Sequence, residues 1–235
     1  MNARLNRPMV IWVAVAFLVC LIGFGVIAWL VSQPVIPPID TATTDFLHGL
    51  ANPTLDALMI AVTDLGSSVV LAAVVGLAAV LLVVRRRRPE ALFIVVALVG
   101  TLVLNDWLKV LFQRPRPGFD WAEVPPEFSF PSGHSMNSFV VYVAIALVIW
   151  RLEGRRVGIV ALALAILLAV SVGISRVYLG AHWLSDVIGG YLAGALWLLF
   201  LVAASAVVSR LLRSGRSDAT AGDGEALPEQ SRPAR

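Results

Sequence analysis

Six apolar stretches alternate with short polar segments along the chain, and each is close to the length of a membrane-spanning helix. An α-helix needs roughly 20 mainly apolar residues to cross a bilayer. The stretches comprise residues 9–31, 67–84, 89–112, 135–150, 157–174 and 184–211. The pattern therefore predicts an all-α, polytopic membrane protein with six transmembrane helices.

Two of the polar segments predict how one end of this bundle is built. Residues 53–62 are amphipathic, and we expect them to lie at the membrane interface, because Asp56, Thr63 and Asp64 fit poorly in hydrocarbon. Residues 113–131 are rich in proline, which cannot continue a helix. An ordered or semi-rigid loop should therefore follow the third span.

The end of the chain differs in composition from the rest. Residues 214–235 are rich in Gly, Ala, Ser, Pro and acidic residues, a composition typical of disorder. No internal repeat is visible. The predicted organisation is one six-helix membrane domain, residues 1–213, followed by a disordered cytoplasmic tail.

Composition excludes a soluble domain. The chain of 235 residues has 59% hydrophobic residues, 14% charged residues and a mean hydropathy of +0.86. Residues 9–31 follow Arg4 and Arg7, as in a secretory signal, but Trp29 and Leu30 stand where small residues would mark cleavage. We therefore expect a retained membrane anchor. The single cysteine excludes an internal disulfide.

Arginine clusters at alternate ends of successive spans predict the orientation in the membrane. The clusters are Arg4 and Arg7, residues 85–88, Arg151 with Arg155 and Arg156, and Arg210 with Arg213 and Arg216. Cytoplasmic loops carry an excess of Lys and Arg, so both termini should be cytoplasmic. Short basic clusters between apolar stretches usually set topology, and we expect no nucleic-acid partner.

The third polar turn on the opposite, outer side contains a candidate nucleophile. If the segment from residue 181 onward is helical, His182 and Asp186 lie four residues apart on one face, where the carboxylate can accept a hydrogen bond from the imidazole. Such a pair activates the other ring nitrogen as a base or a nucleophile. Arg176 supplies a fork of donors suited to an anionic phosphate. The alternative is a polar clamp between helices.

Two further clusters fall on the same outer side. Lys109 and Arg116 are cations at the end of the third span, and they suit phosphate binding or contact with lipid headgroups. Ser132 and Gly133 precede an apolar helix, so Ser132 is a candidate N-cap and the backbone N–H groups there can bind an oxyanion. His134 would lie at the rim of that site. Taken together, the clusters predict a pocket for a phosphoryl group.

These residues match a family signature in three parts. Residues 109–117 read K-V-L-F-Q-R-P-R-P, residues 131–134 read P-S-G-H, and residues 175–186 read S-R-x5-H-x3-D. The sequence thereby resembles the type 2 phosphatidic acid phosphatase (PAP2) superfamily of membrane lipid phosphatases, whose signature is K-x6-R-P, P-S-G-H and S-R-x5-H-x3-D. Every defined position is filled at the family spacing.

The resemblance implies a hydrolase that forms a phosphohistidine. His182 would attack phosphorus, Asp186 would hold its ring, and His134 would protonate the leaving oxygen and then activate water. The phosphoryl oxygens would be bound by Lys109, Arg116, Arg176 and the backbone at Ser132 and Gly133. No metal and no cofactor are expected, because these cations would do the work of Mg²⁺.

Two rival readings and the substrate stay open from the sequence. Vanadate-dependent haloperoxidases carry a similar signature, and a non-catalytic membrane scaffold or transporter is a second alternative. The expected partner is a lipid phosphate in the plasma membrane, with phosphatidic acid, phosphatidylglycerol phosphate and undecaprenyl diphosphate as candidates. An outward-facing site favours recycling of a carrier lipid diphosphate. The sequence does not define an oligomeric state.

Overall fold

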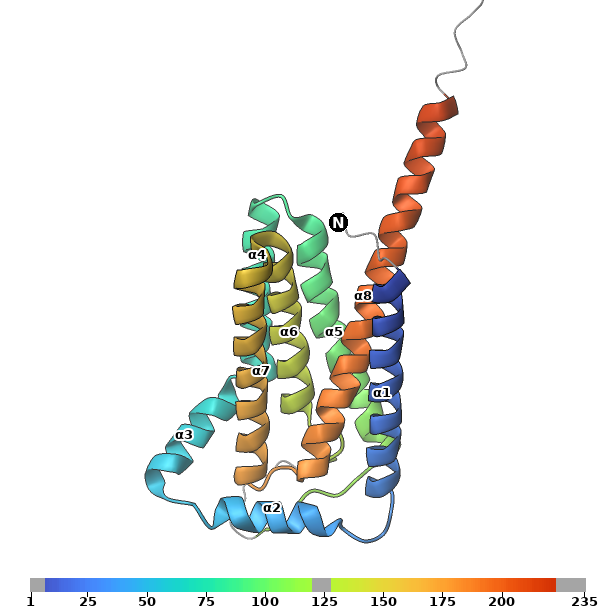
Figure 1. Cartoon of the computed structure of the whole chain (residues 1–235). Helices are drawn as coiled ribbons and strands as arrows, with labels where there is room; N and C mark the ends of the chain where they lie inside the picture. Colours follow the sequence, from blue (N-terminus) through green and yellow to red (C-terminus); the bar gives the residue numbers. More distant parts are fainter. Residues whose placement is uncertain (1–6, 120–127, 223–235) are drawn as a thin grey trace, which may run out of the picture.

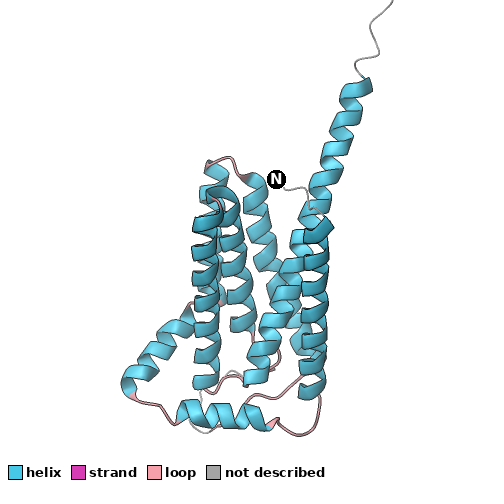
Figure 2. Ribbon diagram, viewed as in Figure 1, coloured by secondary structure: helices cyan, strands magenta, loops and turns pink. Residues whose placement is uncertain are grey.

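The chain folds into α-helices joined by short turns and loops (Figure 2). The computed structural model describes residues 7–119 and 128–222, and these contain eight α-helices and no strand. The helices are α1 (Arg7–Val31), α2 (Pro38–His48), α3 (Pro53–Asp64), α4 (Ser68–Val84), α5 (Arg88–Phe112), α6 (Gly133–Glu153), α7 (Arg155–Tyr178) and α8 (Leu184–Gly222). The all-α fold predicted from the apolar pattern is confirmed.

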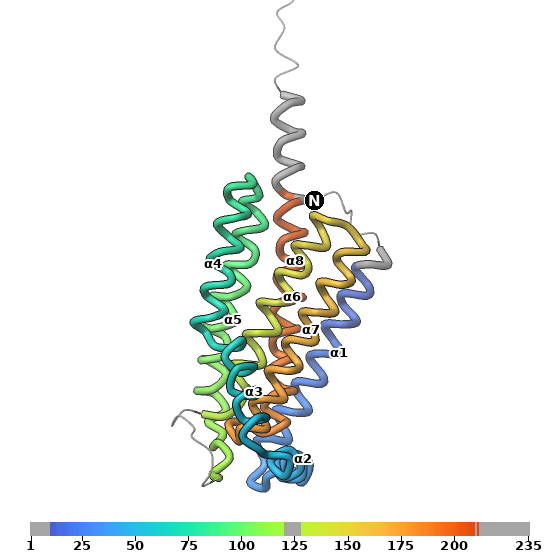
Figure 3. The backbone as a smooth tube through the Cα atoms, turned by 90° about the vertical axis from the view of Figure 1, so that its left-hand side faces the viewer, coloured from blue at the N-terminus to red at the C-terminus, as the bar shows by residue number. Residues whose placement is uncertain are grey.

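Helix α6 lies at the centre of a bundle. It packs against α4, α5, α7 and α8, and α1 packs on α8. Figure 1 shows the long helices side by side along a common direction, with α2 crossing the bundle at one end. Turned by 90°, the bundle again has α2 at that end (Figure 3). The molecule therefore has two distinct ends separated by the length of its helices.

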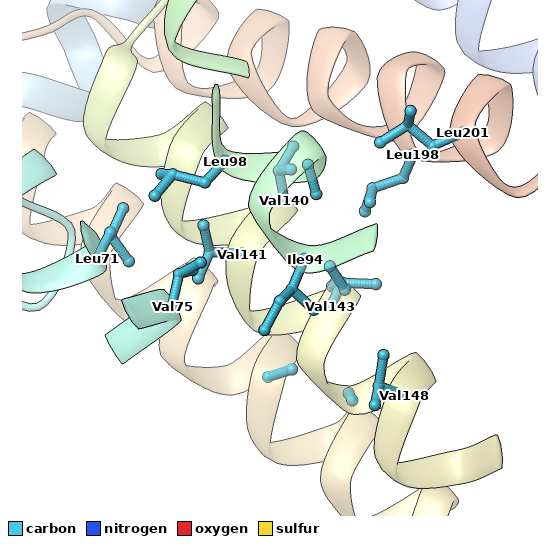
Figure 4. Packing of buried hydrophobic residues seen from close by; sticks show 14 residues of the cluster. Leu71, Val75, Ile94, Leu98, Val140, Val141, Val143, Val148, Leu198 and Leu201 are labelled. Atoms are coloured by element: carbon cyan, nitrogen blue, oxygen red, sulfur yellow. The ribbon is translucent and has the colours of Figure 1, made fainter. Parts of the chain in front are cut away.

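Branched aliphatic side chains fill the space between α4, α5 and α6. Leu71, Val75, Ile94, Val140 and Val141 meet there, and each is at most 3% exposed (Figure 4). Compact side chains let helix backbones approach closely, and dispersion contacts of this kind hold membrane helices together.

The outer surface of the bundle is strongly apolar. Trp12, Val69 and Val84, for example, are between 71% and 80% exposed. A surface that faces water rarely exposes so many large apolar side chains. Five helices of the described chain are long and apolar enough to cross a membrane. Helices α3 and α4, which meet at a bend of 49°, provide a sixth crossing if the pair counts as one span. The prediction of a multi-span membrane protein is confirmed.

Two segments differ from the prediction. Helix α2 was not expected; Pro38 in its first turn suits a helix start, because the N–H that proline lacks has no intrahelical partner there.

Helix α8 continues through residues 214–222, where we expected disorder, since a change from apolar to polar side chains does not by itself end a helix. Residues 223–235 lie outside the described residues. The division into a domain and a tail stays a prediction.

The arginine-rich segments gather at one end of the bundle. Figure 1 shows the start of α1, the α4–α5 turn, the α6–α7 turn and the C-terminal part of α8 at the end opposite to α2. The α4–α5 turn carries Arg85, Arg86 and Arg87, and Arg155 begins α7. This arrangement agrees with the charge pattern used above, while the orientation of the termini stays a prediction.

Gly190 lets α8 approach the start of α6. A Cβ atom at this position would lie 2.9 Å from the carbonyl oxygen of Ser132 and 3.2 Å from the backbone nitrogen of Met136. Neither backbone atom can move away without displacing α6, so this close contact needs glycine.

We expect Gly190→Ala to destabilise the bundle by about 1–3 kcal/mol, because the added methyl group overpacks the contact between α6 and α8. The measurement is the thermal unfolding midpoint of the detergent-solubilised protein. Gly76→Ala in α4 is the matched control, since a Cβ there meets nothing within 4 Å. Equal midpoints for the two variants would contradict the prediction.

Candidate active site

The predicted site residues come from four helices and the connections between them, and they meet at the end of the bundle that α2 crosses (Figure 1). Lys109 lies in the last turn of α5 and His134 in the first turn of α6. Arg176 lies in the last turn of α7, His182 in the α7–α8 connection and Asp186 in the first turn of α8. Distant stretches of sequence therefore form one cluster.

His182 is buried and oriented by both of its ring nitrogens. Its side chain is 2% exposed, and its Nδ1 lies 3.5 Å from Oδ2 of Asp186. Its Nε2 lies 3.1 Å from Nη1 of Arg116, which also donates to the carbonyl oxygen of Ala181 at 2.7 Å. Because arginine only donates, these contacts fit a ring with the proton on Nδ1 and the lone pair on Nε2.

The helix expected from residue 181 begins later, at Leu184. Residues 179–183 form the α7–α8 turn, and the backbone N–H of Trp183 donates to Oδ2 of Asp186 at 2.9 Å. Asp186 therefore holds the turn that carries His182 as well as the imidazole itself. The two side chains meet, although they do not share a helix face.

The environment keeps the His182 imidazole neutral. Its burial, assisted by the positive charges of Arg176 and Arg116, lowers the pKa of His182 from 6.5 to about 4, while Asp186 acts in the opposite direction. A neutral imidazole retains the lone pair that a nucleophile or base requires.

The start of α6 contributes a capped helix N-terminus. Ser132 is the N-cap, as predicted, and its Oγ accepts from the backbone N–H of Ser135 at 3.4 Å. The backbone N–H of Ser132 donates to the carbonyl oxygen of Asp186 at 3.0 Å, which ties α6 to α8. A Cβ on Gly133 would lie 2.9 Å from Oδ1 of Asn105, so a larger residue there would require the Asn105 amide to shift.

Positive charge converges on His134. Lys109, Arg116 and Arg176 lie near enough for their positive charges to act on its imidazole, and His182 also interacts with it. Arg176 donates from Nη1 to Oγ1 of Thr63 at 3.0 Å. Its buried Nε forms no hydrogen bond with the described chain. An unsatisfied buried guanidinium N–H among other cations is suited to an anionic ligand.

A cavity of about 570 Å³ lies beside Arg176, between the α2–α3 connection, α3 and the end of α7. Its polar lining includes Asp56, Thr63 and Tyr178, and Oη of Tyr178 donates to Oδ1 of Asp56 at 2.5 Å. The cavity is large enough for a polar headgroup and offers hydroxyl and carboxylate partners for it.

Four buried residues of the site were not expected from the sequence: Asp40, Arg114, Ser129 and Ser185. Arg114 donates from Nη1 to Oδ1 of Asp186 at 2.5 Å, and Ser129 Oγ donates to Oδ2 of the same carboxylate. Arg114 lies within the first signature segment, where its proximity to Arg116 was the one available signal. The others lie at positions whose importance only the folded chain reveals.

The described residues contain no group of three or more His, Cys, Asp and Glu side chains placed to hold a metal ion. The fold and the cluster together define a multi-span membrane protein with a buried histidine–aspartate pair among cations at one end. The chain belongs to the PAP2 superfamily, whose family model matches residues 90–209.

The relatives found by sequence are membrane lipid phosphatases. The chain is 33% identical over 185 residues to phosphatidylglycerophosphatase B of Bacillus subtilis, covering 76% of this chain and 89% of the relative. It is 32% identical over 155 residues to an undecaprenyl-diphosphatase of Sulfolobus acidocaldarius, covering 63% and 69%. This protein is therefore a member of a family of membrane lipid phosphatases.

A solved structure shares the fold. The crystal structure of a transmembrane PAP2-type phosphatidylglycerolphosphate phosphatase from Bacillus subtilis superimposes with a TM-score of 0.74 at 29% identity. The match covers 80% of this chain and 94% of the solved one. The similarity to this family expected from the three-part signature is confirmed, while the roles of individual residues stay predictions.

We expect His182 to remain neutral down to about pH 4 in the ligand-free protein. Since its pKa is lowered, the ring gains a proton only when the pH falls through that value. The measurement is a ¹⁵N NMR titration of histidine-labelled protein in detergent, with His182→Gln to assign the signal. A midpoint near 6.5, the ordinary histidine value, would contradict the prediction.

Proposed function

We propose that this protein hydrolyses the terminal phosphate of a membrane lipid through a phosphohistidine formed on Nε2 of His182. The observation that carries the proposal is the orientation of His182, with Nδ1 toward the buried carboxylate of Asp186 and Nε2 toward the guanidinium of Arg116. A neutral nucleophile that faces bound cations is what in-line attack on a phosphate requires.

In the first step, Nε2 of His182 attacks phosphorus as the bond to the leaving oxygen breaks. Arg116 turns away from Nε2 and binds a phosphoryl oxygen instead, together with Lys109 and Arg176. Asp186 accepts a hydrogen bond from Nδ1 and offsets the positive charge that the ring acquires. His134, in the imidazolium form that the negative charge of the bound phosphate stabilises, donates a proton to the leaving oxygen.

In the second step, water attacks the phosphohistidine. His134, now without its proton, accepts one from the water as the new phosphorus–oxygen bond forms. The phosphorus–nitrogen bond breaks, its electron pair returns to Nε2, and inorganic phosphate leaves. In both steps the basic side chains neutralise the charge on the equatorial oxygens, and the backbone N–H of Gly133 donates to one of them, so the proposed reaction uses no metal. The backbone N–H of Ser132, which the sequence also suggested for this role, already donates to the carbonyl oxygen of Asp186.

We place the site on the outer side of the plasma membrane. The support is the concentration of arginine at the opposite end of the bundle. Because cytoplasmic loops of membrane proteins carry an excess of Lys and Arg, that end should face the cytoplasm. Both termini are then cytoplasmic and the chain crosses six times, with α3 and α4 as one bent span. A lipid phosphate would reach the site from the outer leaflet.

Phosphatidylglycerol phosphate is the first substrate to test. The relative of which 89% is covered and the solved structure of which 94% is covered are both named for it. The polar cavity beside Arg176 could accommodate its glycerol, with Asp56 and Tyr178 as hydrogen-bonding partners. Undecaprenyl diphosphate is the second, because other relatives are named for it.

We expect the purified protein to release phosphate from phosphatidylglycerol phosphate in EDTA at the rate seen without chelator. His182→Ala should lose at least about 10³-fold in kcat, because no other group can form the covalent intermediate. The assay presents phosphatidylglycerol phosphate, phosphatidic acid and undecaprenyl diphosphate side by side. A rate that EDTA abolishes, or that survives in His182→Ala, would refute the mechanism.

We expect His134→Ala to slow cleavage of phosphatidic acid by about 10²-fold or more, since a departing alkoxide needs an acid. Cleavage of undecaprenyl diphosphate should lose much less, because its leaving group is a phosphate monoester. The measurement is single-turnover formation of the lipid product, which isolates the first step from hydrolysis of the intermediate. Equal losses on both lipids would rule out His134 as the acid.

A further inference from the structure

Arg114 lies buried between two carboxylates at the base of the site. Its side chain is 3% exposed, with Nη1 at 2.5 Å from Oδ1 of Asp186 and Nη2 at 2.9 Å from Oδ2 of Asp40. Both aspartate side chains are fully buried. One positive charge therefore serves two negative ones, and the three groups together carry a net charge of −1.

Asp40 accepts three hydrogen bonds inside this network. Besides Arg114, its carboxylate accepts from the backbone N–H of Ser185 at 2.8 Å and from Oγ of Ser185 at 2.5 Å. Ser185 precedes Asp186 in the first turn of α8, so Asp40 contacts the turn that holds the carboxylate facing His182. These contacts also fasten α2, which carries Asp40, to the end of the bundle.

The charge of Asp40 decides how strongly Arg114 compensates Asp186. If Arg114 formed an ion pair with Asp186 alone, that pair would be neutral. A positive imidazolium or phosphohistidine at His182 would then face no net negative charge. With Asp40 present, Arg114 is shared, and Asp186 keeps an effective negative charge. Burial makes this effect large, because little solvent screens it.

We propose that Asp40 is a positioning residue of the active site, which binds Arg114 and Ser185 so that Asp186 keeps the negative charge that stabilises a positive ring at His182. The inference rests on the proposed function of His182 as nucleophile. Asp40 lies outside residues 90–209, the part matched by the family model, so the signature residues alone do not contain this group.

Other charged groups that face His182 stay constant in the test. Arg116 contacts it from the loop after α5, Arg176 acts on it from the end of α7, and His134 interacts with it from α6. The two arginines make the ring harder to protonate, and none of these groups is changed in the variants below. A difference between variants therefore reports on Asp40, Arg114 and Asp186.

The experiment compares Asp40→Asn, Arg114→Gln and the double variant carrying both changes. Their net charges differ from that of the wild-type network by +1, −1 and zero. The readout is the acid limb of kcat/KM with phosphatidic acid in detergent micelles, which reports protonation of the free enzyme. Ser185→Ala is the matched control, because it removes the Oγ atom that donates to Asp40 and accepts from Arg114 without changing the charge of the network.

We expect Asp40→Asn to move the acid limb to lower pH by about one unit and Arg114→Gln to move it to higher pH by a similar amount. The double variant should return to within about half a unit of the wild type, and Ser185→Ala should not shift the limb. If Asp40 had a purely structural role, the single variants would lose activity without moving the acid limb in opposite directions. The double variant would then be less active than either single variant. That result would overturn the inference.

A buried charge left without its partner can prevent folding, so each variant is first checked by size-exclusion chromatography and thermal unfolding. If Arg114→Gln does not fold, the comparison of Asp40→Asn with Ser185→Ala still tests the inference. An acid limb that shifts in Asp40→Asn alone supports it, and an acid limb at the same pH in both variants refutes it. Wild-type activity that does not need His182 would instead refute the proposed function. The two failures are therefore distinguishable.

Discussion

The buried carboxylate of Asp186 is the group on which the rest of the site depends. It accepts hydrogen bonds from Arg114, from Oγ of Ser129 and from the backbone of Trp183, and it faces Nδ1 of His182. A carboxylate without these partners would be too costly to bury. These partners come from the α5–α6 connection and the α7–α8 turn, while Asp186 itself lies in α8. Packing of the bundle and orientation of the imidazole therefore depend on one another.

The bilayer explains why the chemistry lies at one end of the bundle. Between the ends, the helices present apolar side chains outward and pack through compact aliphatic ones inward, as in the cluster around Val140 and Ile94. Charged groups are stable only where water or a partner is available. The end that α2 crosses provides both, with α2 itself bound to the site through Asp40.

The cations of the site act on His182 in the ligand-free protein and would bind the substrate in the proposed reaction. Arg116 and Arg176 favour the neutral form of His182 in the ligand-free protein, and the same groups would bind the oxygens of a phosphate. Asp186 acts in the opposite direction and becomes important when the ring turns positive during the proposed reaction. Opposed charges held in fixed positions thus allow one imidazole to be neutral before attack and stabilised after it.

The sequence by itself determined the apolar helices, the family signature and the convergence of His134, Arg176 and His182 at one end, because span length, charge bias and spacing are local properties. It did not determine that Arg114 is shared by Asp40 and Asp186, since these residues are 74 and 72 positions apart from it. No local pattern marks such a contact. Only the packing of α2 across the end of the bundle brought the second carboxylate within reach of the guanidinium.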